Sequence, residues 1–100
     1  VKQMNKLIDV VKVFLIDDDE RVERELVLIR VHRNKDTESS LFRIIDIFKG
    51  RVVHVSSKNF VIELTGHSGK INAFVENIRP YGIQDLMRTG PLALPRYDTK

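Results

Sequence analysis

The side chains that could carry chemistry are three histidines and a short run of alternating charges. His32, His54 and His67 are the only imidazole groups available to a metal ion, and the chain has no cysteine. They lack the i, i+4 spacing on a helix, and any spacing like C-x-x-C, that brings metal ligands together. We therefore expect no metal site here, with a nickel- or zinc-responsive domain as the alternative that a metal titration would detect.

Nucleophilic and acid–base catalysis have equally little support. The serines fall in expected caps and turns, where a hydroxyl bonds to the backbone, and none lies in a nucleophile-elbow sequence. Glu23 and Glu25 flank Arg24, a pattern that favours ion pairing over a tuned acid and base. Glycines occur singly, so no phosphate-binding loop is present. We expect no catalytic residue and no cofactor in this chain.

Composition indicates one small domain plus a fragment of another. The chain has 100 residues, of which 42% are hydrophobic and 31% charged. No stretch approaches the ~20 apolar residues of a membrane span, so we expect no membrane association. Residues 1–20 carry three Lys against five Asp and Glu, whereas residues 21–100 carry fourteen Lys and Arg against nine acids. Because basic and acidic residues alternate, a mixed solvated surface is favoured over a nucleic-acid footprint.

The elements that would position these side chains are organised around an apolar stretch within residues 21–31. In strand geometry one phase carries Val27, Ile29 and Val31, and the other carries Leu26 and Leu28. A strand that is apolar on both phases belongs in the centre of a sheet. We expect its second apolar phase to form a contiguous apolar patch that is covered by self-association or by docking of another subunit.

The remaining elements follow in a regular order. After the strand at 21–31, the residues Asn34–Thr37 supply a turn and an N-cap, and we expect a helix that carries Leu41 to Phe48 and is closed by Gly50. The elements expected next are the strands Val52–Val55 and Phe60–Thr65, joined by the turn Ser56–Asn59; a helix with Ile71 to Ile78, stopped by Pro80 and Gly82; and a strand Ile83–Arg88. This order predicts an α+β, ferredoxin-like βαββαβ fold, a four-stranded antiparallel sheet with two helices on one face. Pro91 and Pro95 make the tail an edge segment or a loosely held end.

Residues 1–20 are expected to belong to a different domain. Met4, Leu7, Ile8 and Val11 have helical spacing, a short β-prone run follows to Ile16, and the acidic residues 17–20 form a linker. We place the domain boundary between residues 1–20 and 21–100. The chain begins with Val1 and without a recognisable signal segment, so we interpret it as a piece of a longer protein.

Several of these stretches, taken together and in order, resemble the small regulatory subunit of acetolactate synthase. The matching segments are Lys2–Val10, Val22–Leu26, Asp46–Phe48, Ile62–Gly66 with Lys70, Tyr81–Ile83 and Arg88–Gly90. The resemblance implies that residues 1–20 are the helix-and-strand remnant of an ACT domain with its linker, and that residues 21–100 are the C-terminal regulatory domain. The amino-acid effector site would then lie mostly upstream of residue 1.

The resemblance also implies a function without an active site. Such a subunit activates the catalytic subunit and confers feedback inhibition by valine or related amino acids in branched-chain amino acid biosynthesis. Thiamine diphosphate, FAD and magnesium would belong to the catalytic subunit. We expect a homodimer in the cytoplasm, or in a plastid or mitochondrion of a eukaryote, with no nucleic-acid partner.

The resemblance and the doubly apolar strand together suggest a subunit or domain interface. Its candidate residues are Arg24, Glu25, Leu26, Leu28, Arg88, Thr89 and Gly90. Their structural alternative is ion pairing across the sheet and a turn in which Gly90 has a positive φ. The alternative function is a stand-alone ferredoxin-like ligand- or RNA-binding module. RNA binding is disfavoured because its middle strands would display aromatic side chains, and only Phe60 is present there.

Overall fold

A computed structural model describes residues 21–96 of the protein, within which residues 24–92 form one compact unit. Its elements are β1 (Arg21–His32), α2 (Glu38–Phe48), β2 (Arg51–Val55), β3 (Asn59–Gly66), α3 (Ser68–Ile78), the 3₁₀ turn η2 (Arg79–Tyr81), β4 (Ile83–Arg88) and β5 (Leu92–Pro95). The helix, strand and linker expected within residues 1–20 lie outside the described residues.

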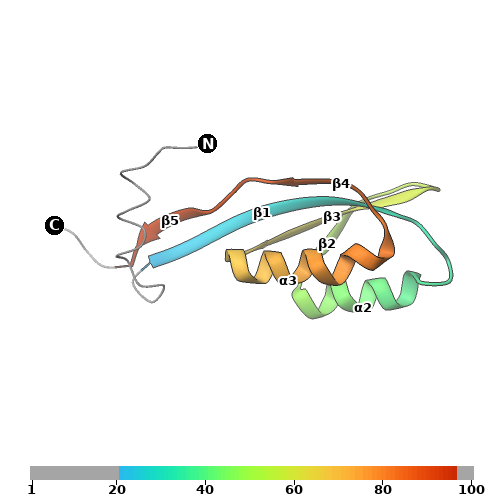
Figure 1. The fold of residues 1–100 in the computed structure, drawn as a ribbon, viewed down its shortest axis with the longest axis horizontal. Helices are drawn as coiled ribbons and strands as arrows, with labels where there is room; N and C mark the ends of the chain where they lie inside the picture. The colour runs from blue at the N-terminus through green and yellow to red at the C-terminus, as the bar shows by residue number, and fades with distance from the viewer. Residues whose placement is uncertain (1–20, 97–100) are drawn as a thin grey trace. The chain divides into compact units, whose positions relative to one another are not determined.

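The sheet has the strand order β2-β3-β1-β4, and each neighbouring pair is antiparallel. Both helices lie on the same side of it (Figure 1). This is the predicted ferredoxin-like βαββαβ arrangement, which is therefore confirmed. A fifth strand, β5, also pairs with β1. Of the two expectations for the tail, the edge segment is confirmed for Leu92–Pro95.

The predicted central position of β1 is also confirmed, because β3 and β4 pair with its two edges. Val27, Ile29 and Val31 point towards the helices and are 0% exposed, whereas Leu28 on the opposite phase is 39% exposed. Alternate side chains of a strand point to opposite faces, so a single strand supplies both the core and the open face. The buried core contains Val27, Ile29, Val31, Leu41, Ile45, Phe60, Ile62, Leu64, Ile71, Phe74, Val75 and Ile78.

The two ends of α2 differ in detail from the expected caps. Thr37 is the N-cap residue, but its hydroxyl donates to the Asn34 carbonyl and makes no cap bond to the helix. At the other end Lys49, and not Gly50, takes the left-handed conformation, with φ 64°. Gly50 lies in a tight place, because a Cβ there would lie 3.3 Å from Ile45 Cγ2 and 3.4 Å from the Glu63 carbonyl oxygen.

Substitution on the two phases of β1 should separate core packing from surface exposure. We expect Ile29→Ala to lower the free energy of unfolding by about 3 kcal/mol, because it removes a fully buried side chain and leaves a cavity. Leu28→Ala is the matched control and should lower it by roughly 1 kcal/mol or less. Urea denaturation of both variants measures the difference, and equal losses would contradict the assignment of the two faces.

The left-handed conformation of Lys49 should be relieved by glycine. We expect Lys49→Gly to raise the free energy of unfolding by about 0.5–1 kcal/mol, because a Cβ is unfavourable at φ 64°. Gly50→Ala should lower it, since the added methyl group meets the Glu63 backbone. The midpoints of thermal unfolding measure both changes, and a lower midpoint for Lys49→Gly would contradict this account.

Candidate functional site

Five of the seven predicted site residues meet at one end of the β1–β4 pair. Val27 lies opposite Arg88 in the antiparallel register, so the residues before Val27 lie beside those that follow Arg88. The residues brought together in this way are Glu25, Leu26, Arg88, Thr89 and Gly90. They come from segments about 63 positions apart in the chain, and the pairing of β1 with β4 brings these segments into contact.

The centre of this cluster is the carboxylate of Glu25, which lies on the core-facing phase of β1 and is 3% exposed. Two nitrogens of Arg88 donate to it: Nε donates to Oε2, and Nη2 donates to Oε1 at 3.0 Å. Ser68 Oγ donates to Oε1 at 3.0 Å, and Arg88 Nη1 donates to Asn72 Oδ1 at 2.7 Å. Two parallel N–H···O bonds give the pair a fixed geometry. We call these four side chains, Glu25, Arg88, Ser68 and Asn72, the Glu25 cluster.

Thr89 and Gly90 extend the contact beyond the cluster. The Thr89 amide donates to the Leu26 carbonyl at 3.0 Å, and the Leu26 amide donates to Thr89 Oγ1 at 3.1 Å. Gly90 has φ 81°, as the structural alternative required. Its amide also donates to the Glu25 carboxylate. The structural roles of these residues are therefore confirmed, whereas the interface role stays a prediction.

The contacts of Glu25 lower the pKa of its carboxyl below the ordinary value of 4.5. The hydrogen bond from Arg88 is the largest cause, burial opposes it by disfavouring the charged form, and the Ser68 hydroxyl, the Arg88 charge and the Gly90 amide add to the lowering. The folded protein therefore holds Glu25 ionised at pH values where the unfolded chain protonates it.

The other two predicted residues, Arg24 and Leu28, lie on β1 with the opposite phase, on the helix-free face. Leu28 sits between Glu63 of β3 and Met87 of β4. Leu28 and Met87 are 39% and 73% exposed. Ion pairs flank them, Arg51 with Glu63 at 3.3 Å and Arg30 with Asp85 at 3.0 Å. The open face is thus apolar only in its middle, and not the continuous apolar patch that the sequence suggested.

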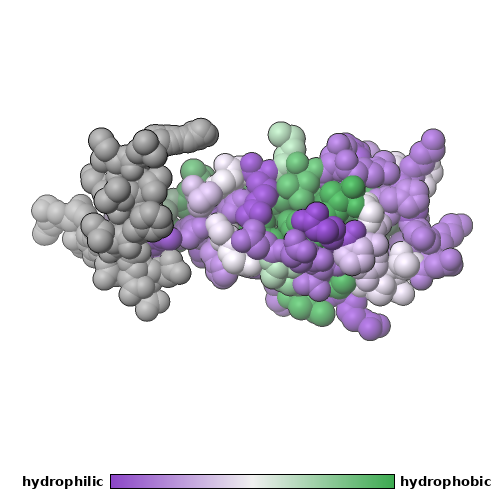
Figure 2. Space-filling model, viewed as in Figure 1, coloured by the Kyte–Doolittle hydropathy of each residue, from purple (hydrophilic) through white to green (hydrophobic). Residues whose placement is uncertain are grey.

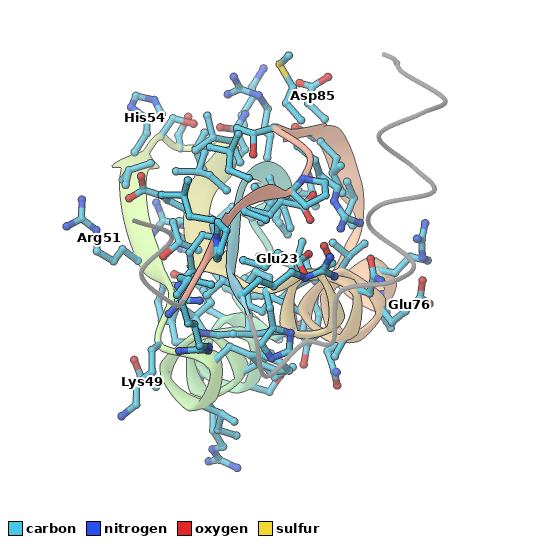
Figure 3. The ribbon with its side chains drawn as sticks, turned by 90° about the vertical axis from the view of Figure 1, so that its left-hand side faces the viewer. Glu23, Lys49, Arg51, His54, Glu76 and Asp85 are labelled. Atoms are coloured by element: carbon cyan, nitrogen blue, oxygen red, sulfur yellow. The ribbon has the colours of Figure 1, made fainter. Side chains whose placement is uncertain are left out.

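The figures show how this face is arranged. His54 and Asp85 lie on the side of the sheet away from both helices, and Arg51 extends from the β2 edge (Figure 3). In the side view of Figure 2, which sees the sheet edge-on, apolar side chains gather around the middle of β4 and hydrophilic ones lie on either side of them. A face of this composition is typical of a modest, partly polar contact surface.

The three histidines are placed apart, at the end of β1, in β2 and before α3. His67 caps α3, because its Nδ1 accepts the Lys70 amide at 3.2 Å. Among residues 21–96 no group of three or more His, Asp or Glu side chains could hold a metal ion. Within the same residues, no helix has the length and apolar character needed to cross a membrane.

Two members of the Glu25 cluster, Ser68 and Asn72, were missed from the sequence. They are four residues apart on α3 and therefore share one face of the helix, which is a signal the sequence contains. The apolar stripe of Ile71, Phe74 and Val75 is the stronger periodic signal in the same segment. Nothing in the sequence showed that this polar face meets β1.

Acidification should expose the contribution of Glu25 to stability. A carboxyl with a lowered folded pKa stabilises the protein fully above its unfolded value near 4.5, and loses that contribution as pH falls through the lower folded pKa. We expect Glu25→Gln to cost about 2 kcal/mol at neutral pH and to flatten the pH dependence below about 4.5. Asp85→Asn, in an exposed pair, is the control and should keep the slope. Urea titrations between pH 7 and 3 measure both, and parallel curves for Glu25→Gln and the unaltered protein would contradict the assignment.

The sequence of this chain is similar to those of one known protein family. Residues 24–97 match the family described as the small subunit of acetolactate synthase. A probable acetolactate synthase small subunit of Archaeoglobus fulgidus is 44% identical over 100 residues, and one of Methanothermobacter thermautotrophicus is 46% identical over 96 residues. These matches take in 100% and 95% of this chain but only 62% and 57% of those proteins.

A solved structure shows the same fold. The crystal structure of the acetolactate synthase small subunit from Thermotoga maritima superimposes with a TM-score of 0.76 at 28% sequence identity. The match covers 99% of this chain and 69% of that one. The resemblance read from the sequence is confirmed. This chain belongs to the family of acetolactate synthase small subunits.

Proposed function

We propose that the protein containing this chain is a regulatory subunit that binds the catalytic subunit of acetolactate synthase and raises its activity. The observation that carries the proposal is the family match over residues 24–97, together with identities of 44% and 46% to small subunits. The chain spans about 60% of the length of those relatives. The effector response, to valine or a related amino acid, is part of the proposal and rests on the family alone.

The proposed role involves no chemistry by this chain. Thiamine diphosphate, FAD and magnesium would be held by the catalytic subunit, which carries out the condensation. A regulatory subunit changes a rate by binding one conformation of its partner more tightly than another. The subunit would work as a homodimer in the compartment of its partner, the cytoplasm or a eukaryotic organelle.

The middle of the open face is the surface that best suits this contact. Leu28 and Met87 are exposed next to each other, and the flanking pairs Arg51–Glu63 and Arg30–Asp85 form a polar rim. An apolar centre with a polar rim is the usual composition of a protein interface. The predicted interface residues Leu26 and Leu28 lie on this face, whereas the Glu25 cluster lies beneath it, on the side of the helices.

Reconstitution with the catalytic subunit tests the proposal. We expect the full-length regulatory subunit to increase the rate of acetolactate formation and to make that rate sensitive to a branched-chain amino acid. Leu28→Asp should reduce the activation, because it places a charge in the apolar middle of the face. Acetolactate formation as a function of subunit concentration is the measurement.

Ile47→Asp is the matched control, since Ile47 is 68% exposed on α2, and α2 lies on the side of the sheet opposite this face (Figure 1). It should leave activation unchanged. No binding and no change in rate with the unaltered subunit would refute the proposed function. Salt-dependent binding of single-stranded RNA in a gel shift would favour the RNA-binding alternative instead.

A further inference from the structure

β4 is attached to the rest of residues 24–92 in an unusual way. Its helix-facing positions, read from the register with β1, are Ile83, Leu86 and Arg88. Ile83 packs against the core, but Leu86 is 37% exposed and Arg88 is charged. By contrast, β3 places Phe60, Ile62 and Leu64 in the core with exposures of 1%, 0% and 2%. β4 therefore buries less apolar surface than β3 does, and least of all at its Arg88 end.

Chain connectivity does not compensate for this. The other outer strand, β2, also buries little, but a short turn joins it directly to its partner β3. β4 pairs with β1 across a sequence separation of more than 50 residues. Closing a long loop costs more entropy than closing a hairpin, so β4 gains less from its connection than β2 does.

The far end of β4 is held by polar contacts. Arg88 bonds to Glu25 and Asn72, and the Thr89 amide bonds to the Leu26 carbonyl at 3.0 Å. The Glu25 carboxylate is buried, so loss of Arg88 would leave a charge without compensation in the core. Breaking the Glu25–Arg88 pair is therefore costly, because the Glu25 carboxylate would stay buried without its counter-charge.

We propose that the Glu25–Arg88 pair is a latch for the C-terminal half of β4. When the latch is broken, residues 86–90 leave the edge of β1 as one local unit, while β1, β2, β3 and both helices stay folded. The domain then has two states that differ at one sheet edge. This inference does not depend on the proposed function, because it concerns residues 24–92 alone.

The same two strands contain a natural comparison. Arg30 and Asp85 also join β1 to β4, but their side chains are 40% and 71% exposed. An exposed pair contributes little, because water replaces the lost contact. Asp85→Asn therefore removes an ion pair between the same strands without opening the latch.

Hydrogen exchange of the full chain, followed residue by residue, tests the latch. We expect Glu25→Gln to speed exchange at the Thr89 amide and its β4 neighbours by about tenfold or more, and we expect these amides to exchange faster than those of Phe60 and Ile62 in the unaltered chain as well. The His32 amide, which donates to the Gly82 carbonyl at 3.0 Å beside the Ile83 end, should keep its protection. Asp85→Asn should leave all of these rates nearly unchanged.

Each other outcome overturns the proposal. In the unaltered chain, exchange of the Thr89 amide at the rate and with the urea dependence of Ile62 would mean that β4 opens only with the whole domain, and no acceleration at Thr89 in Glu25→Gln would mean that the pair holds nothing. If Glu25→Gln fails to fold, Asn72→Ala is the milder variant, and it should give a smaller acceleration confined to the same amides. The unaltered chain gives a further test in low urea. There the Thr89 amide should exchange through a local opening with a weaker urea dependence than that of Ile62.

Discussion

The burial of alternate side chains along β1 is the constraint on which the rest of this domain depends. Val27, Ile29 and Val31 are fully buried, and they lie against both helices and next to both neighbouring strands. Both helices cover this row of side chains, β3, β4 and β5 pair with the backbone of β1, and β2 pairs with the outer edge of β3. Because strand side chains alternate, the same burial forces Leu28 and its neighbours onto the open face.

Glu25 occupies the next position of the same buried row, where an apolar side chain would be expected. Its carboxylate is compatible with burial because Arg88, Ser68 and the Gly90 amide together supply the hydrogen bonds that water would have made. The row therefore changes at one end from apolar packing to a polar cluster. This change explains why β4 is packed at one end and held by charge at the other.

The open face of the sheet is the surface on which we place the proposed contact with the catalytic subunit. The fold is shared with the Thermotoga maritima small subunit, and residues 24–97 match the family. On the described residues the open face combines exposed Leu28 and Met87 with two ion pairs, and the opposite charges within each pair neutralise each other. Such a face can bind and release a partner without the large apolar area of a permanent interface. That composition suits the proposed regulatory contact better than a fixed one.

The sequence by itself determined the order of elements, the central strand, the family and most of the candidate site. Periodicity identified both helices and all four strands of the βαββαβ unit, because apolar spacing depends only on which residues a helix or strand must bury. It placed Arg88–Gly90 among the site residues through the family resemblance. It could not show that Lys49 would take the left-handed conformation, because that conformation is unfavourable for a residue with a Cβ and nothing in the local sequence marks it.

Only the tertiary structure decided which polar residues meet. Glu25, Ser68, Asn72 and Arg88 come from three elements, and no local pattern joins them. Their contact follows from the antiparallel register of β1 and β4 and the position of α3 beneath the sheet, which are set by long-range packing. For the same reason the sequence predicted two apolar phases on β1, but the ion pairs that divide its open face became visible only with the neighbouring strands in place.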